Sequence, residues 1–257
     1  MFYKKENEAE FREKAGYEIG EEWYPRVTKI MEIKSKPALY RFYSAVGFDN
    51  GEKIKEKSAT EGTMVHEAVQ KIMVGEDPIV PLEIKPAVDA FIKFKERNLI
   101  EAYPELIEKR VVHNFFRYAG TVDAIVNLNG RFGVLDIKTS QSVYRDYNLQ
   151  TAAYFDALKE KFPELSARWI LRIDQAQKCM ACGAVLRTKG GRKKITKPFP
   201  YVNGMCKEEE HAWSDPQGII ELSESPASHE NDFEAFLGAK RLWEWENETM
   251  LKKIGYL

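Results

Sequence analysis

The chain has 257 residues, of which 44% are hydrophobic and 12% aromatic, and a formal net charge of −1 at pH 7. It is long enough for a sizeable core in one large domain, or in one domain with an insertion, and its composition is ordinary for a globular protein. The charge excludes a protein coated in basic surface, so a nucleic-acid partner would require a local basic strip.

The first 22 residues form a charged N-terminal segment without the apolar stretch of a signal peptide. No apolar stretch in the chain approaches the roughly 18 residues that span a bilayer. We therefore expect a cytoplasmic protein with no membrane partner. The main domain is expected over residues 23–257, interrupted at residues 176–216 by an insertion of different composition.

Helical patterns dominate the first hundred residues. Residues 27–46 predict two short helices broken at Pro37. From Gly62 onward, apolar residues repeat at helical spacing and form a buried stripe of Val65, Val69, Ile72 and Met73. His66 lies beside this stripe, where a lone histidine is more often a packed or capping residue than a metal ligand. Residues 86–99 predict an amphipathic helix that carries Val88, Phe91 and Ile92.

Two short apolar runs in the middle of the chain are joined by Asn129-Gly130. Asn-Gly between alternating apolar runs is the strongest short-range hairpin signal, so residues 121–128 and 131–138 should pair as antiparallel strands. In this hairpin Asp123 and Asp136 lie near the opposing ends of the two strands.

The end of this hairpin concentrates charge. Because side chains alternate faces along a strand, Asp136 and Lys138 project to the same side, and Ile137 turns into the core. With Asp123, two carboxylates and an ammonium group then converge. Carboxylates at close range repel each other, and a divalent cation relieves that repulsion, which predicts a Mg²⁺ or Mn²⁺ site able to polarise a phosphodiester and activate water. The alternative is an exposed hairpin with surface ion pairs only.

Two flanking segments bear on this site. Glu108, in the apolar run of residues 106–116, could extend the acidic cluster, but one sequence does not fix its strand register. Residues 147–161 predict an amphipathic helix after the second strand of the hairpin. Gln150 and Tyr154 lie one turn apart on one face of this helix. As an isolated pair they would be a solvated polar edge and a core aromatic.

The insertion carries a basic hairpin around Gly190-Gly191. Its cationic residues are Arg187, Lys189, Arg192, Lys193, Lys194 and Lys197. We expect this hairpin to grip nucleic-acid phosphates, with Phe199 and Tyr201 near its base stacking on a base of a single strand. The alternative is a soluble, lysine-rich edge.

The three cysteines of the chain all lie in this insertion. Cys179 and Cys182 form a Cys-x₂-Cys knuckle, and Cys206 and His211 complete the four ligands of a tetrahedral structural zinc site. Unligated thiols in a solvated insert are the alternative. An iron–sulfur cluster is the rival metal group.

The last elements frame the insertion. Residues 168–173 predict a strand leading into it, and residues 218–222 a strand leading out. Residues 228–253 predict one long closing helix, whose inner side carries Phe233, Phe236, Leu237, Leu242 and Trp243. We expect Trp243 and Trp245 to be packing anchors.

Several of these segments together resemble one known family. The motifs are Gly-Thr-Met-Val-His66, Gly-Thr-Val-Asp123, Asp136-Ile-Lys138-Thr-Ser and Gln150-Thr-Ala-Ala-Tyr154, preceded by Trp23-Tyr24-Pro25-Arg26-Val27-Thr28 and Lys36-Pro37-Ala38-Leu39. In order and spacing they resemble the RecB-like branch of the PD-(D/E)XK nucleases. The resemblance runs from about residue 23 to 175 and resumes near residue 217.

The resemblance implies the fold and the roles of the site residues. The fold would be α/β, with a restriction-endonuclease-like core in which a small mixed sheet is flanked by helices. His66, Asp123, Asp136 and the Ile137 carbonyl would ligate the metal, and Lys138 would be the catalytic lysine. Gln150 and Tyr154 would orient the lysine, the metal shell or the scissile strand. A histidine ligand suits Mn²⁺ at least as well as Mg²⁺.

The expected function is that of a Mg²⁺- or Mn²⁺-dependent deoxyribonuclease, by resemblance an exonuclease on single-stranded DNA ends, in repair, recombination or mobile-element processing. Some RecB-like exonucleases hold an iron–sulfur cluster with a cysteine far upstream, which this chain lacks. Two alternatives stay open. One is a non-catalytic zinc-knuckle nucleic-acid-binding module. The other is a subunit active only with a helicase or recombination partner, or in a CRISPR-type assembly.

Overall fold

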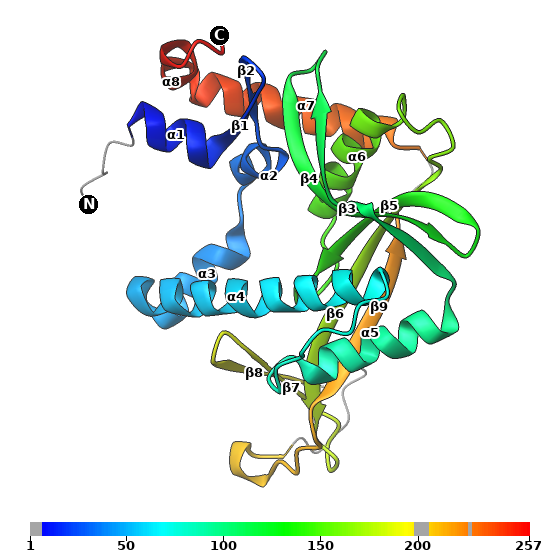
Figure 1. Cartoon of the computed structure of the whole chain (residues 1–257). Coiled ribbons are helices and arrows are strands. Elements are labelled where there is room, and N and C mark those ends of the chain that lie inside the picture. The colour runs from blue at the N-terminus through cyan, green and yellow to red at the C-terminus, as the bar shows by residue number, and fades with distance from the viewer. Residues whose placement is uncertain (1–6, 198–205, 226–227) are drawn as a thin grey trace.

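The computed structural model describes residues 7–197, 206–225 and 228–257 (Figure 1). Its helices are α1 (Glu8–Ala15), α2 (Val27–Ile30), α3 (Pro37–Val46), α4 (Phe48–Met73), α5 (Lys85–Arg97), α6 (Asp146–Leu158), α7 (Glu230–Glu246) and α8 (Glu248–Lys253), with short 3₁₀ turns at Met31–Ile33 and Glu208–Glu210. Its strands are β1 (Gly16–Ile19), β2 (Glu22–Pro25), β3 (Ile100–His113), β4 (Tyr118–Leu128), β5 (Arg131–Lys138), β6 (Ala167–Lys178), β7 (Val185–Lys189), β8 (Arg192–Thr196) and β9 (Gln217–Glu224).

The main sheet has mixed strand directions. Its order is β3-β4-β5-β6-β7-β8, and β9 also pairs with β6. The β5 and β6 strands run parallel, joined through α6, while the other pairs are antiparallel. A parallel pair needs such a crossover connection, and here it places α6 against the sheet directly after Lys138. The expected mixed sheet flanked by helices is confirmed.

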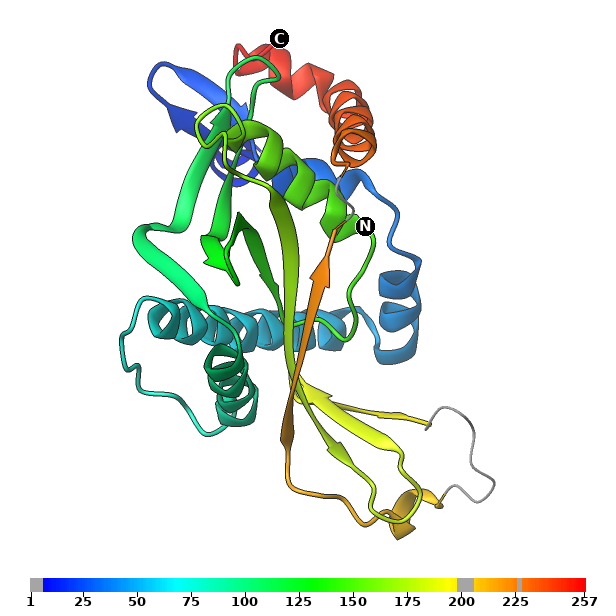
Figure 2. The same cartoon turned by 90° about the vertical axis from the view of Figure 1, so that its right-hand side faces the viewer.

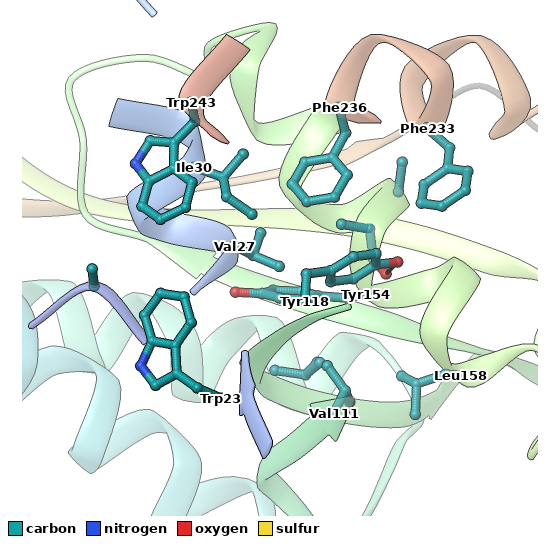
Figure 3. Close-up of a cluster of buried hydrophobic side chains, with 14 of the residues drawn as sticks. Trp23, Val27, Ile30, Val111, Tyr118, Tyr154, Leu158, Phe233, Phe236 and Trp243 are labelled. Atoms are coloured by element: carbon teal, nitrogen blue, oxygen red, sulfur yellow. Dashed lines mark hydrogen bonds between the residues drawn. The ribbon is translucent and has the colours of Figure 1, made fainter. Parts of the chain in front are cut away.

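The sheet separates two hydrophobic clusters. One cluster joins α1, α2, α6 and α7 to the sheet and includes Trp23, Ile30, Tyr154, Phe236 and Trp243 (Figure 3). The other joins α4 and α5 to the opposite side through Val69, Phe91 and Ile137. Since side chains alternate along a strand, neighbouring residues such as Val134 and Leu135 of β5 belong to different clusters. Helices on both faces therefore fix the position of β5.

The predicted central hairpin is confirmed. Leu128 of β4 pairs with Arg131 of β5, and the two turn residues, Asn129 and Gly130, both have positive φ angles of 52° and 82°. Two positive φ angles in a row are what a two-residue hairpin turn of type I′ requires, and Asn-Gly adopts them readily. The Asn129 side chain also accepts a hydrogen bond of 2.9 Å from the backbone N–H of Leu99, which ties the turn to the start of β3.

The long insertion begins and ends where β6 and β9 pair. These strands run side by side past α4 and α5, and the β7–β8 hairpin follows at their far end (Figure 2). The hairpin turns at Gly190 and Gly191, which have φ angles of 60° and 78°. The strands predicted to enter and leave the insertion are thus confirmed, although each is longer than expected.

Two residues predicted to pack against the protein, Leu242 and Trp245, are exposed instead. On α7 the buried residues are Phe233, Phe236, Lys240, Trp243 and Glu244, spaced three or four apart, so one face of the helix meets the core. Leu242 and Trp245 lie outside this stripe and are 47% and 67% exposed. On α5, Phe91 lies on the buried face of the helix, and the next residue, Ile92, points away from that face and is 38% exposed. The predictions that Leu242 lies on the inner side of the closing helix and that Trp245 is a packing anchor were therefore wrong.

The chain ends also differ from expectation. The closing helix is not continuous, because Asn247 ends α7 and α8 begins at Glu248. Part of the charged N-terminal segment joins the core: Phe11 of α1 stacks between Trp23 and Trp243, with ring centroids 5.9 and 6.1 Å apart. In the described part of the chain, no helix combines the length and apolarity needed to cross a bilayer.

Candidate functional site

The candidate site lies where β5 ends beside the middle of β4, between α4 and α6. Asp123 on β4 accepts a hydrogen bond of 2.6 Å at Oδ2 from the backbone N–H of Ile137 on β5. This contact locks the two strands together at the level of Asp136, which is almost wholly buried. The Ile137 side chain points into the core on the other side, as the strand alternation predicts.

Lys138 connects the carboxylates to α6. Its Nζ lies 2.6 Å from Asp136 Oδ2, donates a 3.2 Å hydrogen bond to Gln150 Oε1 and sits 5.1 Å from the ring centroid of Tyr147. Gln150 Nε2 in turn donates to the Tyr154 hydroxyl at 3.0 Å. The predicted same-face pair of Gln150 and Tyr154 is therefore part of one polar chain that holds the lysine in place.

Two glycines allow this close packing. A Cβ at Gly120 would lie 2.5 Å from the ring of Tyr154, so only glycine fits there without displacing the tyrosine. A Cβ at Gly62 would lie 2.9 Å from the Thr139 hydroxyl, where α4 passes close to the end of β5. The glycines of both Gly-Thr motifs thus have a steric role beside the candidate site.

Helix α4 contributes the remaining polar groups. His66 Nδ1 lies 3.7 Å from Asp123 Oδ2. One turn later, Gln70 donates hydrogen bonds to the Asp123 carbonyl at 3.3 Å and to Glu108 Oε1 at 2.6 Å. Gln70 was not among the residues predicted for the site, although its spacing of four from His66 places both on one face of the helix. Glu108 reaches the site's margin through Gln70.

Burial and charge act on this cluster in opposite directions. Burial raises the pKa of Asp136 to about 6, against the lowering effect of Lys138. Burial also raises the pKa of Asp123, but His66 and Lys138 outweigh it, and the net shift is downward. Burial lowers the pKa of Lys138, yet Asp136 and Asp123 outweigh it and the net shift is upward. The Tyr154 hydroxyl, with a pKa raised chiefly by burial, stays neutral.

The acidic cluster is not a compact ligand set as it stands. His66 and Asp123 approach each other, whereas Asp136 directs Oδ2 at Lys138, and in the described residues this buried atom has no partner with hydrogen-bond geometry. Within the described residues, three or more potential metal ligands come close enough together to share one ion only in the insertion. The acidic side chains therefore lie near one another without forming a closed cage.

Two hollows flank the cluster. The first, here called the α3 pocket, has a volume of about 800 Å³ and is reached by Lys138 and Gln150. The second has a volume of about 520 Å³ and is lined by His66, Gln70 and Glu108 among others. Lys138 lines the α3 pocket, and the next residue, Thr139, lines the second cavity. The cluster therefore has a separate cavity on each side.

The cysteines and His211 form the predicted ligand group. The ligand atoms of Cys179, Cys182, Cys206 and His211 all lie within 4.8 Å of one another, with Cys179 Sγ 4.0 Å from Cys206 Sγ and Cys182 Sγ 3.5 Å from His211 Nδ1. A tetrahedral zinc with bonds of about 2.3 Å to sulfur and 2.0 Å to nitrogen requires separations of about 3.8 and 3.5 Å. The group could therefore hold a metal ion such as zinc.

Local structure supports this group. The Gly183 N–H donates to the Cys179 carbonyl at 2.9 Å, with Gly183 at a φ of 74°, which closes the knuckle. The His211 ring stacks on Trp213 with centroids 4.4 Å apart. Burial tends to raise the pKa of Cys179, but backbone and His211 hydrogen bonds lower it to about 6. Burial and the neighbouring thiols raise the pKa of Cys206 to about 11. A thiolate is thus favoured at one position before any ion binds.

The basic hairpin rests on α4. Its tip residue Gly190 donates a backbone hydrogen bond of 3.0 Å to Glu61, and a Cβ there would overlap Ser58 and the Ile54 carbonyl. Lys189 Nζ lies 3.9 Å from the same Glu61 carboxylate. The hairpin is therefore docked on α4, and it is not a free arm.

The six predicted nucleic-acid-binding residues differ in their surroundings. Arg187 is engaged inside the protein, with hydrogen bonds of 2.6 Å to Asp174 and 3.0 Å to the Thr139 carbonyl. Arg192 lies over the Phe42 ring at 5.1 Å, and Lys194 donates to Gln141 at 2.8 Å. The exposed members are Lys193, Lys194 and Lys197. Phe199 and Tyr201, predicted to stack on a base, lie outside the described residues.

Comparisons with known proteins add no family to these observations. No protein-family model matches the chain, and no curated protein does so either. Any functional assignment therefore depends on the residues and contacts described above.

Proposed function

We propose that the chain is a metal-dependent deoxyribonuclease of the PD-(D/E)XK superfamily, in its RecB-like branch, and that it acts as an exonuclease on single-stranded ends. The observation that carries this proposal is the contact set around Lys138. Asp136 lies 2.6 Å from its Nζ, Gln150 accepts its hydrogen bond, and Asp123 is bound to the backbone between Asp136 and Lys138. Surface ion pairs alone would not require this degree of burial.

The residues suit a hard divalent cation. Asp136 Oδ2 is buried with Lys138 Nζ at 2.6 Å as its ion-pair partner but with no hydrogen bond in the described residues, and the raised pKa of Asp136 reflects the cost of burying its charge. Asp123, Asp136, the Ile137 carbonyl and His66 would hold Mg²⁺ or Mn²⁺, and the imidazole would favour Mn²⁺. When bound, the cation supplies polarisation of the phosphodiester and activation of the attacking water.

The other groups act through position and charge. Lys138, kept protonated by the two carboxylates, stabilises negative charge that develops on the phosphate during in-line attack. Gln150 fixes the Lys138 ammonium group, and Tyr154 fixes the Gln150 amide. Because Tyr154 is buried against Gly120, this support is rigid before substrate arrives.

The insertion supplies a structural metal site and a surface for DNA. We assign Zn²⁺ to Cys179, Cys182, Cys206 and His211, because their ligand atoms all lie within 4.8 Å of one another and the Cys179–Cys206 and Cys182–His211 separations are close to those of a tetrahedral site. Three cysteines and a histidine from one short insert fit a single zinc better than an iron–sulfur cluster. The exposed side chains of Lys193, Lys194 and Lys197 offer the phosphates a local basic strip, which a chain with a net charge near zero needs in order to bind DNA.

The test is a nuclease assay with end-labelled single- and double-stranded DNA, and with RNA, in Mg²⁺ or Mn²⁺. Asp136→Asn and Lys138→Met should each reduce cleavage by on the order of 100-fold or more. Asp89→Asn and Lys93→Met, which make the same changes on the surface helix α5, serve as matched controls. Mononucleotide products would support exonuclease action. Cleavage that persists in both site variants would refute the assignment of this site.

A further inference from the structure

The α3 pocket is more apolar than a phosphate site needs. It is bounded by α2, α3 and α6, and its apolar lining comprises Met31, Pro37, Ala38, Leu39, Phe42, Tyr144 and Tyr147. At one end it reaches Lys138 and Gln150 of the candidate site. A volume of about 800 Å³ lies within the range of small-molecule sites, which are likewise mostly apolar with a few polar groups.

Helix α3 leaves its apolar side chains without a core partner. The helix has the sequence PALYRFYSAV, yet none of its residues is buried. An amphipathic helix normally packs its apolar face against the protein. Here Leu39 and Phe42 instead line the pocket, as does Tyr144, which is 48% exposed. The pocket is thus lined by three aromatic side chains, those of Phe42, Tyr144 and Tyr147.

The charges at the pocket favour an anionic ligand. Its two acidic lining residues already have partners, since Glu32 lies 3.0 Å from Lys29 and Asp146 pairs with Lys34. Three lysines also line the pocket, at positions 36, 55 and 138, of which Lys55 and Lys138 are themselves paired with Glu52 and Asp136. Arg192 stands over the Phe42 ring. An apolar interior with a cationic margin complements a base joined to a phosphate.

We propose that the α3 pocket binds the unpaired nucleobase next to the phosphate held at Lys138, by stacking it on Phe42 and Tyr144. This inference rests on the proposed nuclease function and adds a substrate-binding site to it. A base inside a duplex has both faces covered by its stacking neighbours, so it cannot enter without unpairing and unstacking, which costs free energy that an unpaired end does not have to supply. The pocket therefore selects single-stranded ends over paired ones.

The test combines a change in the protein with a change in the DNA. Single-stranded oligonucleotides carry one abasic residue, moved one position at a time, and their binding is measured by fluorescence anisotropy in Ca²⁺ without turnover. The protein variants are Tyr144→Ala and Phe42→Leu, the second of which keeps apolar packing but removes the stacking surface. Tyr40→Ala is the matched control, because Tyr40 is an exposed aromatic on α3 that does not line the pocket.

In the wild-type protein, an abasic residue at one position should weaken binding by on the order of tenfold. In Tyr144→Ala and Phe42→Leu the same abasic residue should have an effect below about twofold, since the stacking partner is already lost. Tyr40→Ala should behave as wild type. Equal abasic effects in all four proteins, or no sensitive position at all, would overturn the proposal. So would wild-type protein that binds no single-stranded oligonucleotide, which would favour an apolar protein segment as the occupant.

The outcome separates this inference from the nuclease proposal. If the abasic effect is lost in the pocket variants but Asp136→Asn leaves all cleavage unchanged, the pocket binds a base and the proposed catalytic role of Asp136 is wrong. If cleavage depends on Asp136 but the abasic effect is the same in the wild-type protein and the pocket variants, the nuclease proposal is supported and the pocket is not a base-binding site. Thermal unfolding of each variant shows whether a loss of binding reflects loss of the fold.

Discussion

Arg187 donates a hydrogen bond of 3.0 Å from Nη2 to the carbonyl oxygen of Thr139, the residue directly after Lys138. The same guanidinium donates from Nε to Asp174 at 2.6 Å. Arg187 belongs to β7 of the insertion, whereas Thr139 follows β5 of the core sheet. The insertion therefore contacts the chain that leaves the candidate site, and Arg187 is better placed to position Lys138 than to bind DNA.

Arg187→Ala should destabilise the protein by about 2 kcal/mol, because it leaves buried Asp174 with only a 3.4 Å contact to Arg172. It should also lower the single-turnover cleavage rate by roughly 10- to 100-fold through a displaced Lys138. Chemical denaturation and quenched-flow cleavage measure the two effects.

Lys193→Ala is the matched control for Arg187→Ala, since it removes an exposed cation from the neighbouring strand β8. It should leave stability unchanged, weaken DNA binding and reduce the salt dependence of binding by about one counterion. If Arg187→Ala gave this same pattern, Arg187 would be a phosphate contact and its proposed positioning role would be wrong.

Metal analysis of the purified protein should find about one zinc ion per chain. Removing it with a chelator should unfold the insertion, because the small cluster of Cys179, Cys182, Ala184, Ile195, Cys206 and Trp213 is a minimal core without a metal. His211→Ala should lower zinc affinity and, through β7 and Arg187, slow cleavage at saturating Mn²⁺. Protein prepared anaerobically that contains neither zinc nor iron would exclude a metal in this group.

Asp156 should make stability depend on pH in the acidic range. Burial tends to raise its pKa, but hydrogen bonds from His113, Lys159 and His229 outweigh burial and lower the pKa to about 2. A carboxyl group whose pKa is lower in the folded state stabilises the protein above its unfolded pKa, and this stabilisation is lost as pH falls from about 4 to 2. The shift corresponds to about 2 kcal/mol.

The measurement is urea denaturation at several pH values for wild type and Asp156→Asn. The wild-type free energy of unfolding should fall between pH 4 and 2 by about 2 kcal/mol more than that of the variant. Asp89→Asn, which alters an exposed ion pair with Lys85, should follow the wild-type curve. Parallel curves for wild type and Asp156→Asn would show that Asp156 has no such role.

In this chain, the features that were predicted correctly from sequence are those encoded by local residue patterns or by residue type. The central hairpin was predictable because Asn129 and Gly130 encode the turn locally, and the Gln150–Tyr154 pair because a helix fixes that spacing. The Cys/His group was predictable from the number and type of its residues, even though Cys182 and Cys206 are distant in sequence.

Features set by contacts between distant segments were not predictable. The β3 strand changes register against β4 between Ala102 and Ile107, and Glu108 has a φ of 48°, so no regular strand pattern could place its carboxylate. The docking of Gly190 on α4 depends on two surfaces that a single sequence does not pair. Leu242 and Trp245 were predicted to pack because they are apolar, but their positions along the helix place them outside its buried face.

Gly120→Ala should reveal how strictly the site depends on packing beneath it. The added Cβ would lie 2.5 Å from the Tyr154 ring, and the displaced tyrosine would carry Gln150 away from Lys138. We expect a loss of about 1–3 kcal/mol in stability from overpacking and a lower cleavage rate at saturating substrate. Thermal unfolding and single-turnover kinetics measure these changes.

Gly238→Ala, in the middle of α7, is the matched control because a Cβ there meets nothing within 4 Å. In an exposed helical position this change should stabilise the protein by up to about 1 kcal/mol and leave cleavage unchanged. If Gly120→Ala were equally harmless to both stability and cleavage, the Tyr154 ring would be free to move aside without disturbing Lys138. The chain from Tyr154 through Gln150 would then be a packing feature only, and Lys138 would have to be held by Asp136 alone.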